Sequence, residues 1–84
     1  MKCESVTEML VLASSHVSST GHLLECVDNP MALTLGFRCT GCLEKWEVSL
    51  TVVKKAGTDL QSQLSTPEGR QSICGKLNRG EQVQ

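Results

Sequence analysis

Two histidines and two cysteines in the first half of the chain are residue types that bind transition metals. Cys39 and Cys42 form a C-x-x-C unit with glycine at its third position, and His16 and His22 precede it. Zinc is usually tetrahedral in proteins and accepts both thiolate sulfur and imidazole nitrogen. The sequence therefore predicts that His16, His22, Cys39 and Cys42 hold one structural zinc ion. Four protein ligands would leave no position for water, as in structural rather than catalytic sites.

Each of these residues also has an interpretation without a metal. His16 falls in the last turn of a predicted helix, where the helix dipole favours a cation, and His22 could simply begin a strand. The C-x-x-C unit could be a redox pair, but such pairs usually stand at a helix N-terminus, and strands are predicted on both sides of this one. Cys3 or Cys74 could replace His16 as the fourth ligand.

The predicted strand pairing separates Cys26 from this site. Composition places a turn at residues 28–31, so that Cys26 would face Leu33, about six residues from Cys39. At the rise of a β-strand, six residues span roughly 20 Å. Cys26 is therefore expected to pack as a small buried thiol, whereas the start of its strand, near His22, is expected to lie beside Cys39.

An amphipathic helix is predicted over residues 6–17. Ser5 and Glu8 match the S-x-x-E capping box, in which two side chains satisfy free backbone N–H groups at a helix start. Gly21 is a suitable stop, because glycine adopts the left-handed conformation without a side-chain clash. Apolar residues then recur at helical spacing: Val6, Met9, Leu10, Ala13 and Val17.

After this helix the hydrophobic period changes to two, which is typical of strands with one buried face. The alternation predicts strands over residues 22–27, 32–38 and 45–53, and a helical segment follows over about 58–78. We expect a single α+β domain, 1–84, in which the N-terminal helix packs on a three-stranded antiparallel meander, with short C-terminal helices and a zinc staple.

The region from Gly21 to Val53, a hairpin followed by a C-x-x-C corner and a third strand, resembles a zinc ribbon. The resemblance is specific at Cys39 and Cys42. Zinc ribbons normally supply a second close pair of ligands, and here the more widely spaced His16 and His22 would take that place. The resemblance implies a small zinc-binding domain.

Composition explains why a metal would matter. The chain has 84 residues, one Phe, one Trp and no Tyr, so its core is small, and domains of this size often depend on a metal, disulfides or oligomerisation. No signal peptide or membrane span is expected, and five cysteines fit a closed disulfide framework poorly. These features favour free thiols and a cytoplasmic, reducing location. The net charge of −1, without a dense basic patch, gives little support to nucleic-acid binding.

The function predicted from these features is a small non-enzymatic module that binds another protein, for example as an inhibitor or adaptor of a larger assembly. No acid pair, phosphate loop or serine motif indicates catalysis. The binding surface is expected on the polar sheet face or the C-terminal segment. The sheet-face residues are Glu47, Ser49, Thr51 and Val53, with Arg38.

Sparse apolar residues in the C-terminal segment, Leu60, Leu64, Ile73 and Leu77, also make a homodimer plausible. The sequence is also compatible with two alternative functions. One is a nucleic-acid-binding zinc ribbon, and the other is a thiol redox switch at Cys39 and Cys42.

Overall fold

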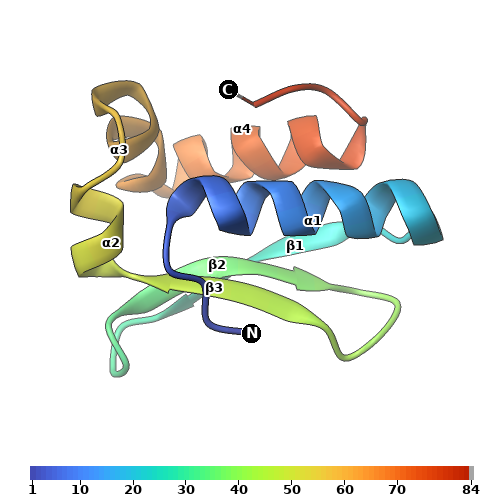
Figure 1. Ribbon diagram of the computed structural model, residues 1–84, viewed down its shortest axis with the longest axis horizontal. Helices are drawn as coiled ribbons and strands as arrows, with labels where there is room; N and C mark the ends of the chain where they lie inside the picture. The colour runs from blue at the N-terminus through green and yellow to red at the C-terminus, as the bar shows by residue number, and fades with distance from the viewer. Residues whose placement is uncertain (84) are drawn as a thin grey trace.

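The computed structural model describes residues 1–83 and has an α+β fold, as predicted. Helices α1 and α4 lie on one face of a three-stranded antiparallel sheet of order β1-β2-β3, and the opposite face carries no helix (Figure 1). The elements are α1 (Val6–Thr20), β1 (Leu24–Asn29), β2 (Thr34–Cys39), β3 (Lys45–Ser49), α2 (Leu50–Lys54), α3 (Thr58–Leu64) and α4 (Pro67–Asn78).

Helix α1 begins as predicted and ends three residues later, at Thr20 instead of Val17. The Glu8 N–H donates to Ser5 Oγ at 3.0 Å, and the Glu8 carboxylate accepts from the Glu4 N–H at 3.2 Å. At the other end Gly21 takes a φ of 73° and donates its N–H to Val17. The longer helix moves His16 away from the last residues of α1.

The β1–β2 register differs from the prediction. Cys26 pairs with Phe37 rather than with Leu33, a shift of four residues, and the turn occupies residues 30–33. The cause is local: Asn29 Oδ1 accepts the Ala32 N–H at 3.2 Å, and Leu33 closes the turn with a φ of 56°. Because the shift is an even number of residues, every side chain keeps its predicted face of the sheet.

The third strand is shorter than predicted, because residues 50–53 are helical. Ser49 ends β3 and caps α2, its hydroxyl accepting the Val52 N–H at 3.2 Å. Alternating apolar residues over this stretch suggested one continuous strand. A five-residue helix places Val53 in the core instead.

The C-terminal segment forms the rest of the helical layer. Thr66 caps α4 through a 3.0 Å bond from the Gly69 N–H, with Pro67 at the first helical position. The Asn78 side chain bonds both backbone groups of Leu24, accepting its N–H at 2.7 Å and donating to its carbonyl at 3.1 Å. This amide pair fastens α4 to the free edge of β1.

The core lies between the sheet and the helices and includes Met9 and Ala13 of α1, Phe37 and Val48 of the sheet, and Ile73 of α4, each fully buried. The first residues cover the other sheet edge, since Cys3 N donates to Glu47 O at 2.7 Å and Glu47 N donates to Met1 O at 3.0 Å. Among the helices described here, none combines the length and apolarity that crossing a membrane requires.

Candidate metal centre

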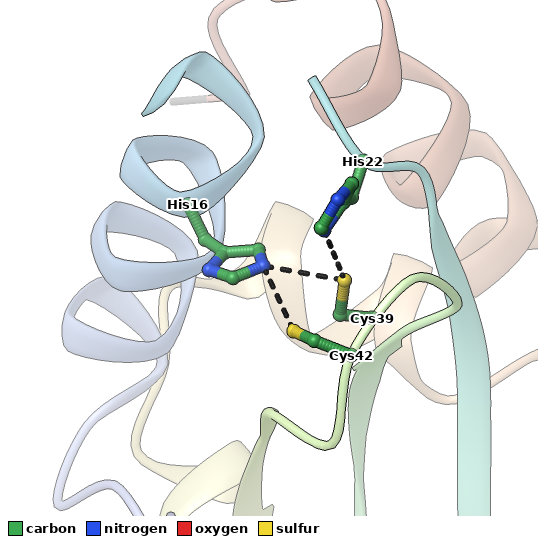
Figure 2. Close-up of side chains that lie close together, drawn as sticks. All are labelled: His16, His22, Cys39 and Cys42. Carbon is green, nitrogen blue, oxygen red and sulfur yellow. Dashed lines mark hydrogen bonds between the residues drawn. The ribbon is translucent and has the colours of Figure 1, made fainter. Parts of the chain in front are cut away.

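The four predicted ligand residues come together at one end of the sheet. The possible ligand atoms of His16, His22, Cys39 and Cys42 all lie within 4.8 Å of one another. Figure 2 shows the two imidazoles and the two thiols converging from α1, from the segment before β1, and from the end of β2 and the turn after it. The residues therefore form a group that could hold a metal ion.

Three sulfur–nitrogen distances within this group match those around a tetrahedral ion. Cys39 Sγ lies 3.2 Å from His16 Nε2 and 3.4 Å from His22 Nδ1, and Cys42 Sγ lies 3.4 Å from His16 Nε2. Zinc bonds of about 2.3 Å to sulfur and about 2.0 Å to nitrogen would separate sulfur and nitrogen ligands by about 3.5 Å. Binding would therefore need only small movements of these side chains.

His16 reaches the site from the C-terminal half of α1. Its backbone carbonyl accepts a 2.7 Å hydrogen bond from Thr20 Oγ1, and its ring packs against Trp46 with centroids 4.9 Å apart. The indole therefore limits the orientation of the imidazole and leaves Nε2 facing the thiols. The sequence indicated His16 through its ligand type, but not this role of Trp46.

His22 lies in the short connection between α1 and β1. Its backbone N–H donates to Thr20 Oγ1 at 3.1 Å, and its ring packs directly on Gly41. A Cβ atom on Gly41 would lie 2.8–2.9 Å from three atoms of the imidazole, closer than side chains tolerate. The glycine of the C-x-x-C unit is therefore required for the close approach of His22.

The turn that carries the thiols is anchored at both ends. Thr40 bonds the Leu23 carbonyl through its N–H at 3.0 Å and its hydroxyl at 2.9 Å, and Cys39 N donates to Glu44 O at 2.9 Å. Cys39 is 2% exposed, whereas Cys42 is exposed to solvent. The site is therefore buried on its Cys39 side and open to solvent at Cys42.

The pKa of the Cys42 thiol is raised when no metal is bound. A hydrogen bond from the Glu44 backbone lowers the pKa of this thiol, but interactions with Cys39, burial and the negative charge of Glu44 outweigh it, so the pKa is raised. A metal must displace that proton, because only the thiolate is a ligand.

The other three cysteines lie outside this group. Cys26 lies midway along the edge strand β1 and pairs with Phe37, Cys3 lies beside β3, and Cys74 Sγ donates to the Leu24 carbonyl at 3.1 Å. Neither Cys3 nor Cys74 takes the place of His16 in the four-residue group. Cys26 is separate, as predicted, although through a different pairing partner.

Such a group can fix one ion by four protein side chains from three separate segments, and so can tie α1 to the strand corner. The ligand set is compatible with the zinc-ribbon resemblance only in the C-x-x-C unit. One histidine lies in helix α1 and the other directly after it, whereas a second hairpin would be expected to supply these ligands in a zinc ribbon. Comparisons with protein-family models, curated proteins and solved structures found no match for this chain.

Proposed function

We propose that the protein is a small, non-enzymatic zinc-binding module that acts by presenting a rigid surface to another protein. The observation that carries this proposal is the convergence of His16, His22, Cys39 and Cys42 within 4.8 Å. Zinc is the metal that best suits two thiolates and two imidazoles in a tetrahedral arrangement. Its binding energy would be folding energy for a chain with a small core.

The absence of catalysis is part of the proposal. Four protein ligands complete the coordination of a tetrahedral ion and leave no position for substrate or water. Both histidines of the chain belong to this group, so neither is free to serve as a general base.

The surface that we assign to partner binding is the face of the sheet without helices (Figure 1). Arg38 and Glu25 form an ion pair there, and Thr34 Oγ1 donates to Glu47 at 3.2 Å. The sheet-face set predicted from the sequence needs one correction: Thr51 and Val53 lie in α2, and Val53 is buried. The surface therefore carries one ion pair and one hydrogen-bonded carboxylate on its strands, and an inhibitor or adaptor of a larger assembly would use it.

Most of the C-terminal apolar residues that suggested a homodimer are buried within a single chain. Leu64, Ile73 and Leu77 are each at most 1% exposed within a single chain, so they need no second copy to cover them. Leu60 is partly buried against the same core. A dimer therefore stays a prediction without support from these residues.

The two alternative functions also lose support. Arg38, Arg70 and Arg79 each lie beside a carboxylate of the same chain, which reduces the charge available for nucleic-acid phosphates. A redox C-x-x-C pair usually stands at a helix N-terminus, which lowers the thiol pKa, whereas this pair lies between β2 and β3. A cytoplasmic, reducing location, which would keep Cys39 and Cys42 reduced and able to bind metal, belongs to the proposal.

Elemental analysis of protein purified without chelator tests the metal centre. We expect about one zinc per chain in the wild type and in Cys26→Ser, which serves as the matched control. The His16→Ala, His22→Ala and Cys39→Ser variants should lose the metal. A metal-free wild type, or zinc retained in all variants, would contradict the proposal.

The partner class is tested with the metal-loaded protein. Binding to nucleic acid that weakens steeply with salt would support the alternative function. Salt-tolerant capture of a protein that is lost in Arg38→Glu and kept in Arg79→Glu would support the sheet face. Arg79→Glu is a suitable control because Arg79 is also an exposed arginine in an ion pair, but lies after α4.

A further inference from the structure

Helix α4 lies along β1 in the opposite direction, and contacts at both ends define how the two elements align. Asn78, in the last turn of α4, bonds the backbone of Leu24 at the start of β1. Two turns earlier, an Arg70 guanidinium nitrogen lies 3.6 Å from a carboxylate oxygen of Asp28. The helix is therefore fastened to the strand at two points, four residues apart on β1.

A pair of cysteines occupies the middle of this alignment. Cys74 stands halfway between Arg70 and Asn78 on α4, and Cys26 stands halfway between Leu24 and Asp28 on β1. Alternate residues of a strand share one face, so the Cys26 side chain points toward the helix layer, as do those of Leu24 and Asp28. It packs against the same core to which the buried Cys74 belongs.

The chemical environment of the two thiols agrees with this placement. Burial, followed by the charge of Cys26 and a hydrogen bond with it, raises the pKa of Cys74 to about 12. Burial also raises the pKa of Cys26, against the opposing effects of its interaction with Cys74 and the positive charge of Arg70. Each thiol therefore has the other as a direct neighbour.

We propose that Cys26 and Cys74 form a reversible disulfide by exchange with a small-molecule disulfide such as glutathione disulfide. This bond fastens α4 to β1 and leaves the metal centre intact. It is a modification site separate from the C-x-x-C unit, and the proposal does not depend on the function of the metal centre.

Cys26 is the attacking thiol, because it is only partly buried whereas Cys74 is 5% exposed. The Cys26 thiolate attacks one sulfur of the small disulfide, whose S–S bond breaks and releases one small thiol. Cys74 sulfur then attacks Cys26 sulfur, and the second small thiol leaves with the Cys74 proton. Two protein thiols are oxidised to a disulfide, and one small disulfide is reduced to two thiols.

The surroundings tolerate the loss of the Cys74 proton. In the dithiol form that proton is donated to the Leu24 carbonyl at 3.1 Å. The same carbonyl also accepts from Asn78 Nδ2 at 3.1 Å, so oxidation leaves it with a partner. Low-pKa thiols favour the reduced state of a redox pair by stabilising the thiolate, and these two thiols lack that stabilisation.

The test uses the metal-loaded protein, equilibrated in buffers of reduced and oxidised glutathione and then alkylated. Trypsin with a glutamate-specific protease releases Cys26 within residues 26–38 and Cys74 within residues 71–76, apart from every other cysteine. We expect these two peptides to be joined, with the metal content unchanged. The oxidised protein should melt at a higher temperature, and dithiothreitol should reverse both effects.

Cys26→Ser and Cys74→Ser should abolish the joined peptide and the rise in melting temperature. Cys3→Ser is the matched control, because Cys3 is also buried but lies beside β3, and it should keep both effects. If Cys74→Ser does not fold, Cys26→Ser gives the same readout at a less buried position. Recovery of both peptides in alkylated form at equilibrium, or a Cys39–Cys42 disulfide formed in their place with metal release, would overturn the proposal.

Discussion

The imidazole of His22 lies against the α-carbon of Gly41 so closely that no side chain fits between them. A Cβ atom at Gly41 would lie 2.8 Å from Cγ of the ring. The ring atom Nδ1 also lies 3.4 Å from Cys39 Sγ. A residue that bears no ligand atom therefore decides whether one proposed ligand reaches its place.

We predict that Gly41→Ala weakens zinc binding by about 10- to 100-fold, the range found when support around a metal ligand is lost. The added methyl group would push His22 away from Cys39. Competition against a chromophoric zinc chelator measures the affinity. Gly57→Ala is the control, because a Cβ there meets nothing within 4 Å, and equal affinities of the two variants would refute the steric argument.

Stability should fall in alkaline solution because of Cys74. The pKa of this thiol is raised from 9.0 to about 12 in the folded chain by burial, then by Cys26. The folded state therefore holds the proton more tightly than the unfolded state, and the stability present below pH 9 is lost as the pH rises toward 12. The slope for one such group is at most about 1.4 kcal/mol per pH unit.

Urea unfolding of the zinc-saturated, reduced protein at several pH values between 8 and 11 measures this loss. The chain has no tyrosine, so no phenol titrates in the same range. Cys74→Ala should give a flatter profile than the wild type, whatever its stability at neutral pH. The same steep slope in Cys74→Ala would assign the effect to other groups.

Asn78→Ala should lower the free energy of unfolding by about 2 kcal/mol. The substitution removes both hydrogen bonds to Leu24 and leaves its backbone N–H without the bond at 2.7 Å; a buried donor without a partner costs about 1–3 kcal/mol. Gln71→Ala, an exposed residue of the same helix, should change stability by less than about 0.5 kcal/mol. Similar urea midpoints for the two variants would show that the amide does not fasten α4.

Leu33→Gly should stabilise the protein. Leu33 has a φ of 56° and an exposed side chain, and the left-handed conformation costs a non-glycine residue roughly 1–2 kcal/mol. Glycine recovers part of this cost, about 1 kcal/mol, which corresponds to a rise of several degrees in melting temperature. Met31→Gly, in the same turn but without a positive φ, should not raise the melting temperature, and a lower melting temperature for Leu33→Gly would contradict the account.

Local signals in the sequence predicted the parts of the fold that local chemistry determines. The Ser5 cap and the Gly21 stop mark the two ends of α1. The ligand types and their spacing indicated all four residues that meet at the candidate site. The register error came from Leu33, because a leucine in the left-handed region has no sequence signal. Its turn was therefore placed two residues too early.

Other features depend on tertiary packing and could not be predicted from the chain alone. The apolar residues after Trp46 alternate as in one continuous strand. The change to a helix depends on Ser49, whose side chain caps α2. The neighbourhood of Cys26 and Cys74 exists only because α4 lies along β1, and 47 residues separate the two in the sequence. The contact of Trp46 with His16 is also a product of packing.

The backbone hydrogen bonds along the edge strand β3 also affect the association of one molecule of this protein with another. On β3, the Lys45 carbonyl accepts the N-terminal ammonium of Met1 at 2.6 Å, and Glu47 is bonded on both its N–H and its carbonyl by the first residues of the chain. Unpaired strand edges are templates for aggregation. A second molecule could add a strand to β3 only after displacing that segment, so the native state is protected against growth into extended sheets from this side.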